Sequence, residues 1–257
     1  MESPTCPRFY TLPADVGVDY PWVLVNWFNR NKLKYHRFKH AILDSGVNRV
    51  FFNWRRDEYP PWLLRQIGYI AQQLSMIYKG RLWVTIPDYP DDYYPGYVRD
   101  NVERTLRNIK RFLPIEGVEW LPVIQSRYLD IFSFYESCER TKQLVGDYPR
   151  IAIGTVCKTR RLSFIEYVVK YARNVFPNSW IHCFGMTLQA LRRLTQGEFN
   201  SFDNTVWDTR KRYWLNSFDN TAYTFPRKPG QPSAKCERMR EQYFKAYLQR
   251  IKEILNQ

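Results

Sequence analysis

The sequence predicts an α/β fold with a parallel sheet, and the preferred architecture is a (β/α)8 barrel followed by a C-terminal helix. Short apolar runs alternate along the chain with longer amphipathic segments, the pattern of parallel strands joined by crossover helices. The length of 257 residues suits one barrel, so we expect a single domain over residues 1–257. A doubly wound open sheet is the alternative, although no G-x-G-x-x-G or G-x4-G-K-[ST] loop follows any expected strand.

Six segments are expected to be strands buried on both faces, because each one is short and almost continuously apolar. They are residues 22–27, 40–43, 82–86, 120–124, 151–153 and 180–184. Two weaker runs, near residues 9–12 and 199–202, bring the number to the eight strands of a closed barrel.

Amphipathic helices are expected between several of these strands and at the end of the chain. The clearest one follows Pro60 and Pro61, where apolar residues from Leu63 to Ile77 recur at spacings of three and four. Four further segments also look helical, which are residues 98–112, 164–171, 188–194 and 237–255. The last of these gives the C-terminal helix.

The composition favours a polyanionic partner. Lysine and arginine total 39 against 25 acidic residues, which gives a net charge of +14, and aromatic residues make up 17% of the chain. A basic, aromatic-rich surface suits phosphate neutralisation together with base stacking, so nucleic acid is the expected partner. Two clusters are candidate phosphate-binding sites, although each also fits an ordinary basic loop: Lys158, Arg160 and Arg161, and Arg210, Lys211 and Arg212. Candidates for stacking on a base are Trp54, Tyr93, Tyr94 and Trp207.

Other features of the sequence bear on membranes, location and metals. No run of about 18 apolar residues occurs, and the first residues lack the apolar core of a signal peptide. We therefore expect no membrane partner and a cytoplasmic location, in the host cytoplasm if the protein is viral. The five cysteines are scattered and contain no C-x2-C pair, which predicts reduced thiols and no metal site.

Polar residues or glycines follow six of the expected strands at the point where each strand ends. In chain order they are Asp44-Ser45-Gly46, Asp88, Gln125, Gly154, Gly185 and Asp203-Asn204. Each of them alone fits an ordinary turn, loop or helix cap. Because the carboxyl ends of the strands meet on one face of a barrel, together they predict a site with three carboxylates, an amide and two glycines.

This set of groups suits chemistry at a glycosidic carbon. One carboxylate can attack the carbon and form a covalent intermediate, and a second can act as acid or base on the leaving group. The remaining carboxylate can accept the N1–H and N2–H2 donors of a guanine edge. A glycine allows close approach of a backbone N–H to the guanine O6.

The same pieces, in the same order, resemble the tRNA-guanine transglycosylase superfamily, whose members are (β/α)8 barrels. That superfamily carries a D-S-G, a second Asp, a V-x-Q, an A-x-G, an H-x-x-G and a late F-D. The matching pieces are Asp44-Ser45-Gly46, Asp88, Val123-Ile124-Gln125, Ala152-Ile153-Gly154, His182-Cys183-Phe184-Gly185 and Phe202-Asp203. Residues 153–157, 184–187 and 201–207 are most similar to the DpdA-like, DNA-modifying branch found in phages and genomic islands.

The resemblance implies a pentosyltransferase that exchanges guanine in DNA for a 7-deazaguanine, such as 7-cyano-7-deazaguanine, without a cofactor. Asp203 matches the nucleophile that attacks the deoxyribose C1′, and Asp44 matches the general acid/base. The groups that match the base-binding pocket are Ser45, Asp88, Gln125, Gly154 and Gly185. DNA, the free 7-deazaguanine base and partner proteins of a modification system are the implied partners.

Two departures from the superfamily pattern leave the substrate and the nucleophile open. The tRNA enzymes carry a C-x-C-x2-C zinc cluster, which is absent here, so a zinc-less tRNA enzyme is the alternative substrate class. A hydrolytic DNA glycosylase and a non-catalytic nucleic-acid-binding barrel also fit the same residues. Residues 217–221 repeat the Ser-Phe-Asp-Asn-Thr of residues 201–205, which makes Asp219 a rival to Asp203 as nucleophile. His182 is expected to be a packed core histidine, and Cys157 and Cys183 are expected to be small buried residues.

Overall fold

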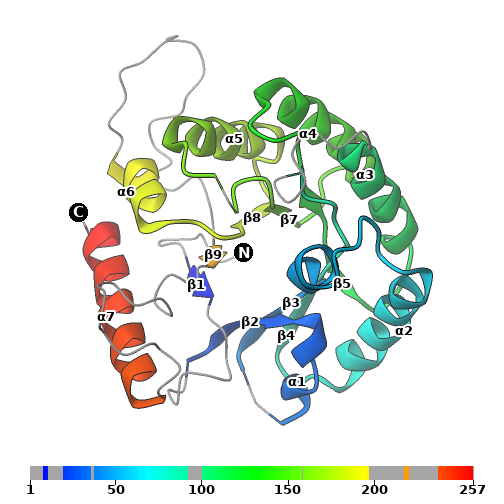
Figure 1. Ribbon diagram of the computed structural model, residues 1–257, viewed down its shortest axis with the longest axis horizontal. Helices are drawn as coiled ribbons and strands as arrows, with labels where there is room; N and C mark the ends of the chain where they lie inside the picture. The colour runs from blue at the N-terminus through cyan, green and yellow to red at the C-terminus, as the bar shows by residue number, and fades with distance from the viewer. Residues whose placement is uncertain are drawn as a thin grey trace.

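The fold is mixed α/β and contains two parallel sheets surrounded by helices (Figure 1). The computed structural model describes residues 8–10, 20–35, 38–91, 100–157, 159–196, 217–219 and 237–256. This architecture confirms the expected α/β class, and the long helix α7 (Glu237–Asn256) confirms the expected C-terminal helix.

The strands form two sheets in which every pairing is parallel. One has the order β2-β3-β4-β5 and the other the order β1-β9-β8-β7-β6. The bounds are β1 Arg8–Tyr10, β2 Trp22–Asn26, β3 His40–Asp44, β4 Arg81–Thr85, β5 Glu119–Leu121, β6 Val123–Ile124, β7 Arg150–Ile153, β8 Trp180–Cys183 and β9 Ser217–Asp219.

The two sheets meet at Pro122, the single residue between β5 and β6. Proline has no N–H to donate to a ladder, so the strand is interrupted there. Its carbonyl still accepts a hydrogen bond of 2.8 Å from the Ala152 N–H, while the Leu121 carbonyl accepts one of 3.0 Å from the Ile86 N–H. Backbone hydrogen bonds therefore continue across the proline from one sheet to the other, and at the opposite side β1 contacts β2.

Helices follow most of the strands and lie on the outside of the molecule (Figure 1). They are α1 Lys32–Tyr35, α2 Pro61–Ile77, α3 Asn101–Phe112, α4 Ile131–Val145, α5 Leu162–Val175, α6 Leu188–Gln196 and α7, together with the short turns η2 Trp27–Asn29 and η3 Asn48–Asn53. Asp100 and Asp130 cap α3 and α4, and each side chain accepts a hydrogen bond from the backbone N–H three residues later.

Apolar side chains cover both faces of the strands, as their nearly continuous hydrophobicity predicts. Ala41 and Leu43 of β3 pack outward with the buried faces of α2 and α3, whereas Ile42 points the other way. It joins an inner cluster with Trp83, Leu121, Val123 and Ala152. These five residues come from both sheets, so the inner cluster ties the two sheets together.

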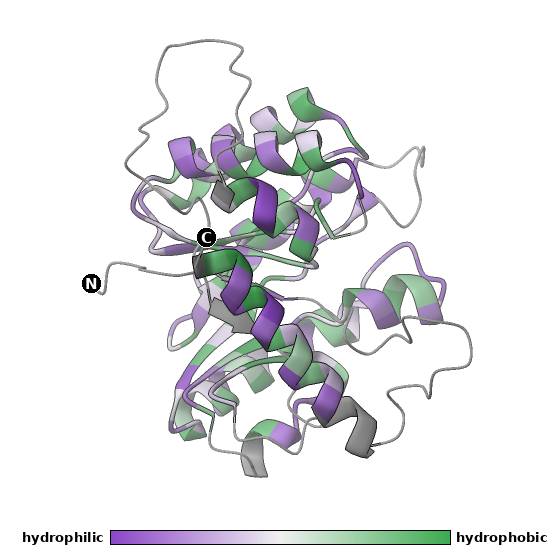
Figure 2. Cartoon of the chain, turned by 90° about the vertical axis from the view of Figure 1, so that its left-hand side faces the viewer, coloured by the Kyte–Doolittle hydropathy of each residue, from purple (hydrophilic) through white to green (hydrophobic). Residues whose placement is uncertain are grey.

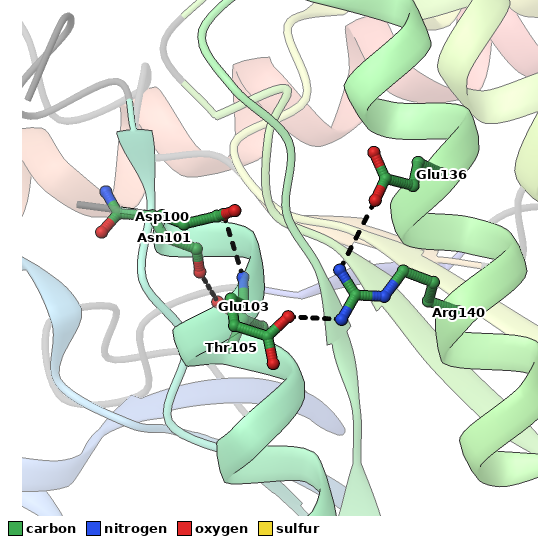
Figure 3. A network of polar contacts seen from close by, with 6 residues as sticks. All are labelled: Asp100, Asn101, Glu103, Thr105, Glu136 and Arg140. Carbon is green, nitrogen blue, oxygen red and sulfur yellow. Dashed lines mark hydrogen bonds and ion pairs between the residues drawn. The ribbon is translucent and has the colours of Figure 1, made fainter. Parts of the chain in front are cut away.

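Polar contacts on the surface link α3 to α4 (Figure 3). The Arg140 guanidinium on α4 pairs with Glu103 on α3 and, at 3.5 Å, with Glu136 on its own helix. All three side chains are partly solvent-exposed, so each pair contributes at most about 1 kcal/mol. The network orients two neighbouring helices but is not the main source of stability.

α7 packs its apolar side against the core, and hydrophilic and hydrophobic residues alternate along it in Figure 2. The expected apolar face is present, because Phe244, Ile251 and Leu255 are buried and Leu248 is packed against them. Within the described ranges, no helix is long and apolar enough to cross a membrane.

The expected strands and helices agree with the structure, with several exceptions. The expected strand 120–124 is divided at Pro122 into β5 and β6, and the short elements η2, α1 and η3 were not expected. α4 was not expected, because the side it buries includes Ser133, Ser137 and Thr141 besides Phe134 and Cys138, which hides the apolar spacing. β9 was not expected either, although it has parallel partners on both sides in β1 and β8. The weak strand expected near residues 199–202 lies outside the described residues.

Candidate active site

Three carboxylates gather at the carboxyl ends of the strands. Asp44 is the last residue of β3, Asp219 is the last residue of β9, and Asp88 follows the end of β4 by three residues. The pKa of Asp44 is raised to about 7, first by burial and then by the negative charges of Asp88 and Asp219. Asp44 is therefore close enough to Asp88 and Asp219 to sense both charges, and it can exist in both protonation states near neutral pH.

Asp44 is held by two hydrogen bonds to one of its oxygens. The Asn26 side-chain amide donates to Oδ2 at 3.1 Å, and the Gly46 N–H donates to the same atom at 3.3 Å. Both bonds favour the charged form, but burial and the neighbouring charges outweigh them. Asn26 and Asp44 face each other because they are paired in the register of β2 and β3.

Asp88 is buried between side chains from two neighbouring segments. The Gln125 amide Nε2 donates to Asp88 Oδ2 at 2.5 Å, and the Ser45 hydroxyl donates to Oδ1 at 3.4 Å. The Ser45 Oγ also lies 2.9 Å from the Tyr59 hydroxyl, whose pKa is raised by burial and by the charge of Asp88. Asp88 is thus fixed in place by hydrogen bonds from both neighbouring segments.

Gln125 presents an unused acceptor beside this carboxylate. Its Nε2 is engaged by Asp88, and its buried Oε1 has no hydrogen-bond partner among the described residues. A buried amide oxygen without a donor is costly. This atom is therefore a candidate acceptor for an N–H donor on a bound ligand.

Gly154 makes room for Gln125. A Cβ at residue 154 would lie 2.2 Å from Gln125 Nε2 and 2.9 Å from Val123 Cγ1, closer than non-bonded atoms approach. Only glycine at this position therefore lets Gln125 reach Asp88.

Asp219 is held from the β8 side. The Gly185 N–H donates to its Oδ1 at 3.0 Å, and His182 Nε2 lies 3.3 Å from the same oxygen. Gly185 has a φ of +66°, and a Cβ there would lie 2.7 Å from the Cys157 Sγ, so glycine is required for both reasons. His182 is fully buried, as expected of a core histidine, yet it also contacts a carboxylate of the cluster.

Six of the residues singled out in the sequence come together in this cluster, or directly contact it. They are Asp44, Ser45, Asp88, Gln125, Gly154 and Gly185. Arg160 and Arg161 lie exposed in the segment between β7 and α5. Asp203, Lys158, Arg210, Lys211, Arg212, Trp207, Tyr93 and Tyr94 lie outside the described residues.

Sequence reasoning missed Asn26 and Tyr59, and it placed Asp219 only as a rival. Asn26 carried a usable signal, because it is the polar residue at the end of an apolar run, as Asp44 is. Tyr59 carried none, since nothing in the sequence brings it to Ser45. Asp219 was hard to place because the segment before it shows only a weak strand pattern.

The two cysteines that were expected to be small buried residues, Cys157 and Cys183, differ in exposure. In the described part of the chain, no group of three or more His, Cys, Asp and Glu residues is placed to hold a metal ion. Cys183 is buried, but Cys157 is exposed, so the expectation of a buried Cys157 was wrong. Cys157 lies beside Gly185, where an added Cβ would stand 2.7 Å from its Sγ.

Comparisons with known proteins assign no family. No protein-family model matches the chain, and no significant match is found among the curated proteins. The geometry of the carboxylate cluster therefore carries the functional argument.

Proposed function

We propose that this protein is a pentosyltransferase that exchanges guanine in DNA for a 7-deazaguanine, such as 7-cyano-7-deazaguanine, through a covalent aspartyl–deoxyribose intermediate. The observation that carries the proposal is the convergence of Asp44, Asp88 and Asp219 with Gln125 at the carboxyl ends of parallel strands. That is where a barrel enzyme carries its chemistry.

The proposal includes closure of the two sheets into one (β/α)8 barrel. If β5 and β6 are counted as one strand broken at Pro122, the described residues contain eight strands. Their order in space, from β2 through β5/β6 to β9 and β1, is then the same as their order in the sequence, with β1 and β2 as the closing neighbours. The backbone hydrogen bonds on either side of Pro122 and the contact between β1 and β2 support closure.

In the first half-reaction, a carboxylate oxygen attacks C1′ and breaks the bond from C1′ to N9 of guanine. Asp203 is the proposed nucleophile by its sequence context, and Asp219 is the alternative because it lies at a strand end of the cluster. Protonated Asp44 gives its proton to the departing guanine. Its raised pKa, about 7, means that an appreciable fraction is protonated at neutral pH.

In the second half-reaction, the 7-deazaguanine takes the place of guanine. Ionised Asp44 removes the proton from N9, and N9 attacks C1′ and releases the aspartate. Two displacements retain the configuration at C1′. Charge and protons balance over the cycle, so no oxidant, reductant or nucleoside triphosphate is consumed.

The base is proposed to lie against Asp88 and Gln125. A carboxylate accepts from the N1–H and N2–H2 donors of guanine, which a 7-deazaguanine shares. Gln125 Oε1, which has no hydrogen-bond partner among the described residues, offers a further acceptor. For duplex DNA the target nucleotide must leave the stack, at a cost of a few kcal/mol, and the net charge of +14 favours the phosphate contacts that offset it.

The test is an exchange assay with radiolabelled guanine and guanine-containing DNA, with tRNA in parallel. We expect label to enter DNA and to be lost in Asp44→Asn. Single Asp203→Asn and Asp219→Asn variants then identify the nucleophile, since only its loss abolishes a covalent protein–DNA adduct. Label that enters tRNA alone would indicate that tRNA, not DNA, is the substrate. Abasic sites in DNA without incorporation of label would indicate a hydrolase.

A further inference from the structure

We propose that the segment after β3 forms a binding surface for a single strand of DNA next to the carboxylate cluster. We call it the aromatic–arginine surface, and it comprises Arg49, Phe52, Trp54, Arg55, Arg56 and Trp62. The inference rests on the proposed function only for the identity of the strand, which is the one that carries the target guanine.

The surface is continuous with the site through a chain of ring contacts. Gly46, whose N–H binds Asp44, lies against the Phe28 ring so closely that a Cβ would stand 2.7 Å from it. The Phe28 and Trp54 rings meet edge to face with centroids 5.1 Å apart, and Trp54 lies 6.3 Å from Trp62. A strand leaving the site along this path meets one aromatic ring after another.

Two of these rings are exposed to an unusual extent for their size. Phe52 is 68% exposed and Trp62 is 46% exposed. Large aromatic side chains are normally placed in cores, so exposure of both within one short segment is informative. Exposed aromatic faces are what single-stranded nucleic acids use for base stacking.

Arginines lie between the aromatic residues. Arg49 lies over the Phe28 ring at 4.9 Å, and Arg55 and Arg56 are exposed. Within the described residues none of the three forms an ion pair, and the nearby Glu58 is paired with Arg104 at 3.1 Å. Asp57 is the one further acidic residue between residues 49 and 62, so the three arginines leave the surface with a net positive charge, which suits phosphates rather than a neutral protein partner.

The test is equilibrium binding of a fluorescein-labelled single-stranded DNA oligonucleotide containing one guanine, followed by fluorescence anisotropy. Trp62→Ala and Phe52→Ala should each raise the Kd by about five- to tenfold, the loss of one stacked base. A plot of log K against the logarithm of the salt concentration has a negative slope. In the double variant Arg55→Gln/Arg56→Gln this slope should become less steep by about 1.4, because two phosphate contacts are lost. Each variant's thermal unfolding midpoint is measured to show that it is folded.

Matched controls come from exposed positions on two helices, α5 and α3. Tyr167→Ala on α5 removes an aromatic ring that is 48% exposed, and Lys110→Gln/Arg111→Gln removes two exposed charges from the last turn of α3. The aromatic control should leave the Kd within about twofold, and the charge control should leave the salt slope near that of the wild type. If the variants of the aromatic–arginine surface bind DNA as the control variants do, the proposal is overturned. It is also overturned if these variants lose binding to phosphatidylserine vesicles but keep normal binding to DNA.

Exchange activity measured on the same oligonucleotide separates this inference from the proposed function. If the variants of the aromatic–arginine surface bind DNA more weakly and neither they nor the wild type exchange guanine, the binding surface is established and the exchange reaction is refuted. If these variants bind DNA and exchange guanine as the wild type does, the exchange reaction is established and the binding surface is refuted.

Discussion

Asp44 combines burial with two negative neighbours, and this shapes both its chemistry and its effect on stability. Its folded-state pKa, about 7, lies above the ordinary value of 3.8. A group with a raised pKa binds its proton more tightly in the folded state, so its stabilising contribution is present at low pH and is lost as pH rises from about 4 to about 7.

Asp44→Asn should therefore gain stability relative to the wild type as the pH increases. We expect the difference in the free energy of unfolding to change in favour of the variant by roughly 2–4 kcal/mol between pH 4 and pH 8, and to level off above about pH 8. Urea unfolding at several pH values measures it. Asp147→Asn, whose side chain is 86% exposed, is the control and should give a flat difference. Parallel curves for Asp44→Asn and Asp147→Asn would contradict the raised pKa of Asp44.

Gly154→Ala should displace Gln125 and loosen Asp88. The expected loss of stability is about 1–3 kcal/mol, because the added methyl group meets Gln125 and Val123 in a packed site. A double-mutant cycle with Gln125→Ala isolates the cause. If the clash with Gln125 dominates, Gly154→Ala costs clearly less in the Gln125→Ala background. An equal cost in both backgrounds would assign the clash to Val123 or to the backbone.

At the scale of elements, the strands were predictable and their interruptions were not. Apolar runs such as β3 and β7 are recognisable because both faces are buried. The break at Pro122 divides one expected strand into β5 and β6, since the ring cannot donate to the ladder. α4 escaped prediction because hydroxyl side chains lie on its buried face, where sequence reasoning looks for apolar ones.

The N-cap of α4 is the element-scale test. Asp130 accepts a hydrogen bond of 3.0 Å from the Ser133 N–H and so fixes the start of the helix that follows Gln125. Asp130→Ala should lower the free energy of unfolding by about 1 kcal/mol. Asp147→Ala, beyond the other end of the same helix, removes only an exposed pair with Lys142 and should stay within about 0.5 kcal/mol. Equal effects in chemical denaturation would argue against the cap.

At the scale of the whole molecule, the site could be predicted from sequence only as far as strand ends are visible. Asp44, Asp88 and Gln125 follow clear strands, and the parallel topology brings them together. Tyr59 and the aromatic–arginine surface belong to the connection after β3, whose path depends on tertiary packing. Asp219 needed the structure, because only its pairing in β9 shows that it faces the cluster.

Guanine exchange in DNA is the reaction that decides whether the protein has the proposed activity. The protein is incubated with guanine-containing DNA and radiolabelled guanine, and label in DNA is compared between the wild type and Asp44→Asn. We expect label in DNA with the wild type, little or none with Asp44→Asn, and chase of the label by 7-cyano-7-deazaguanine. Absence of label from DNA with the folded wild-type protein, or undiminished incorporation by Asp44→Asn, would contradict the proposal.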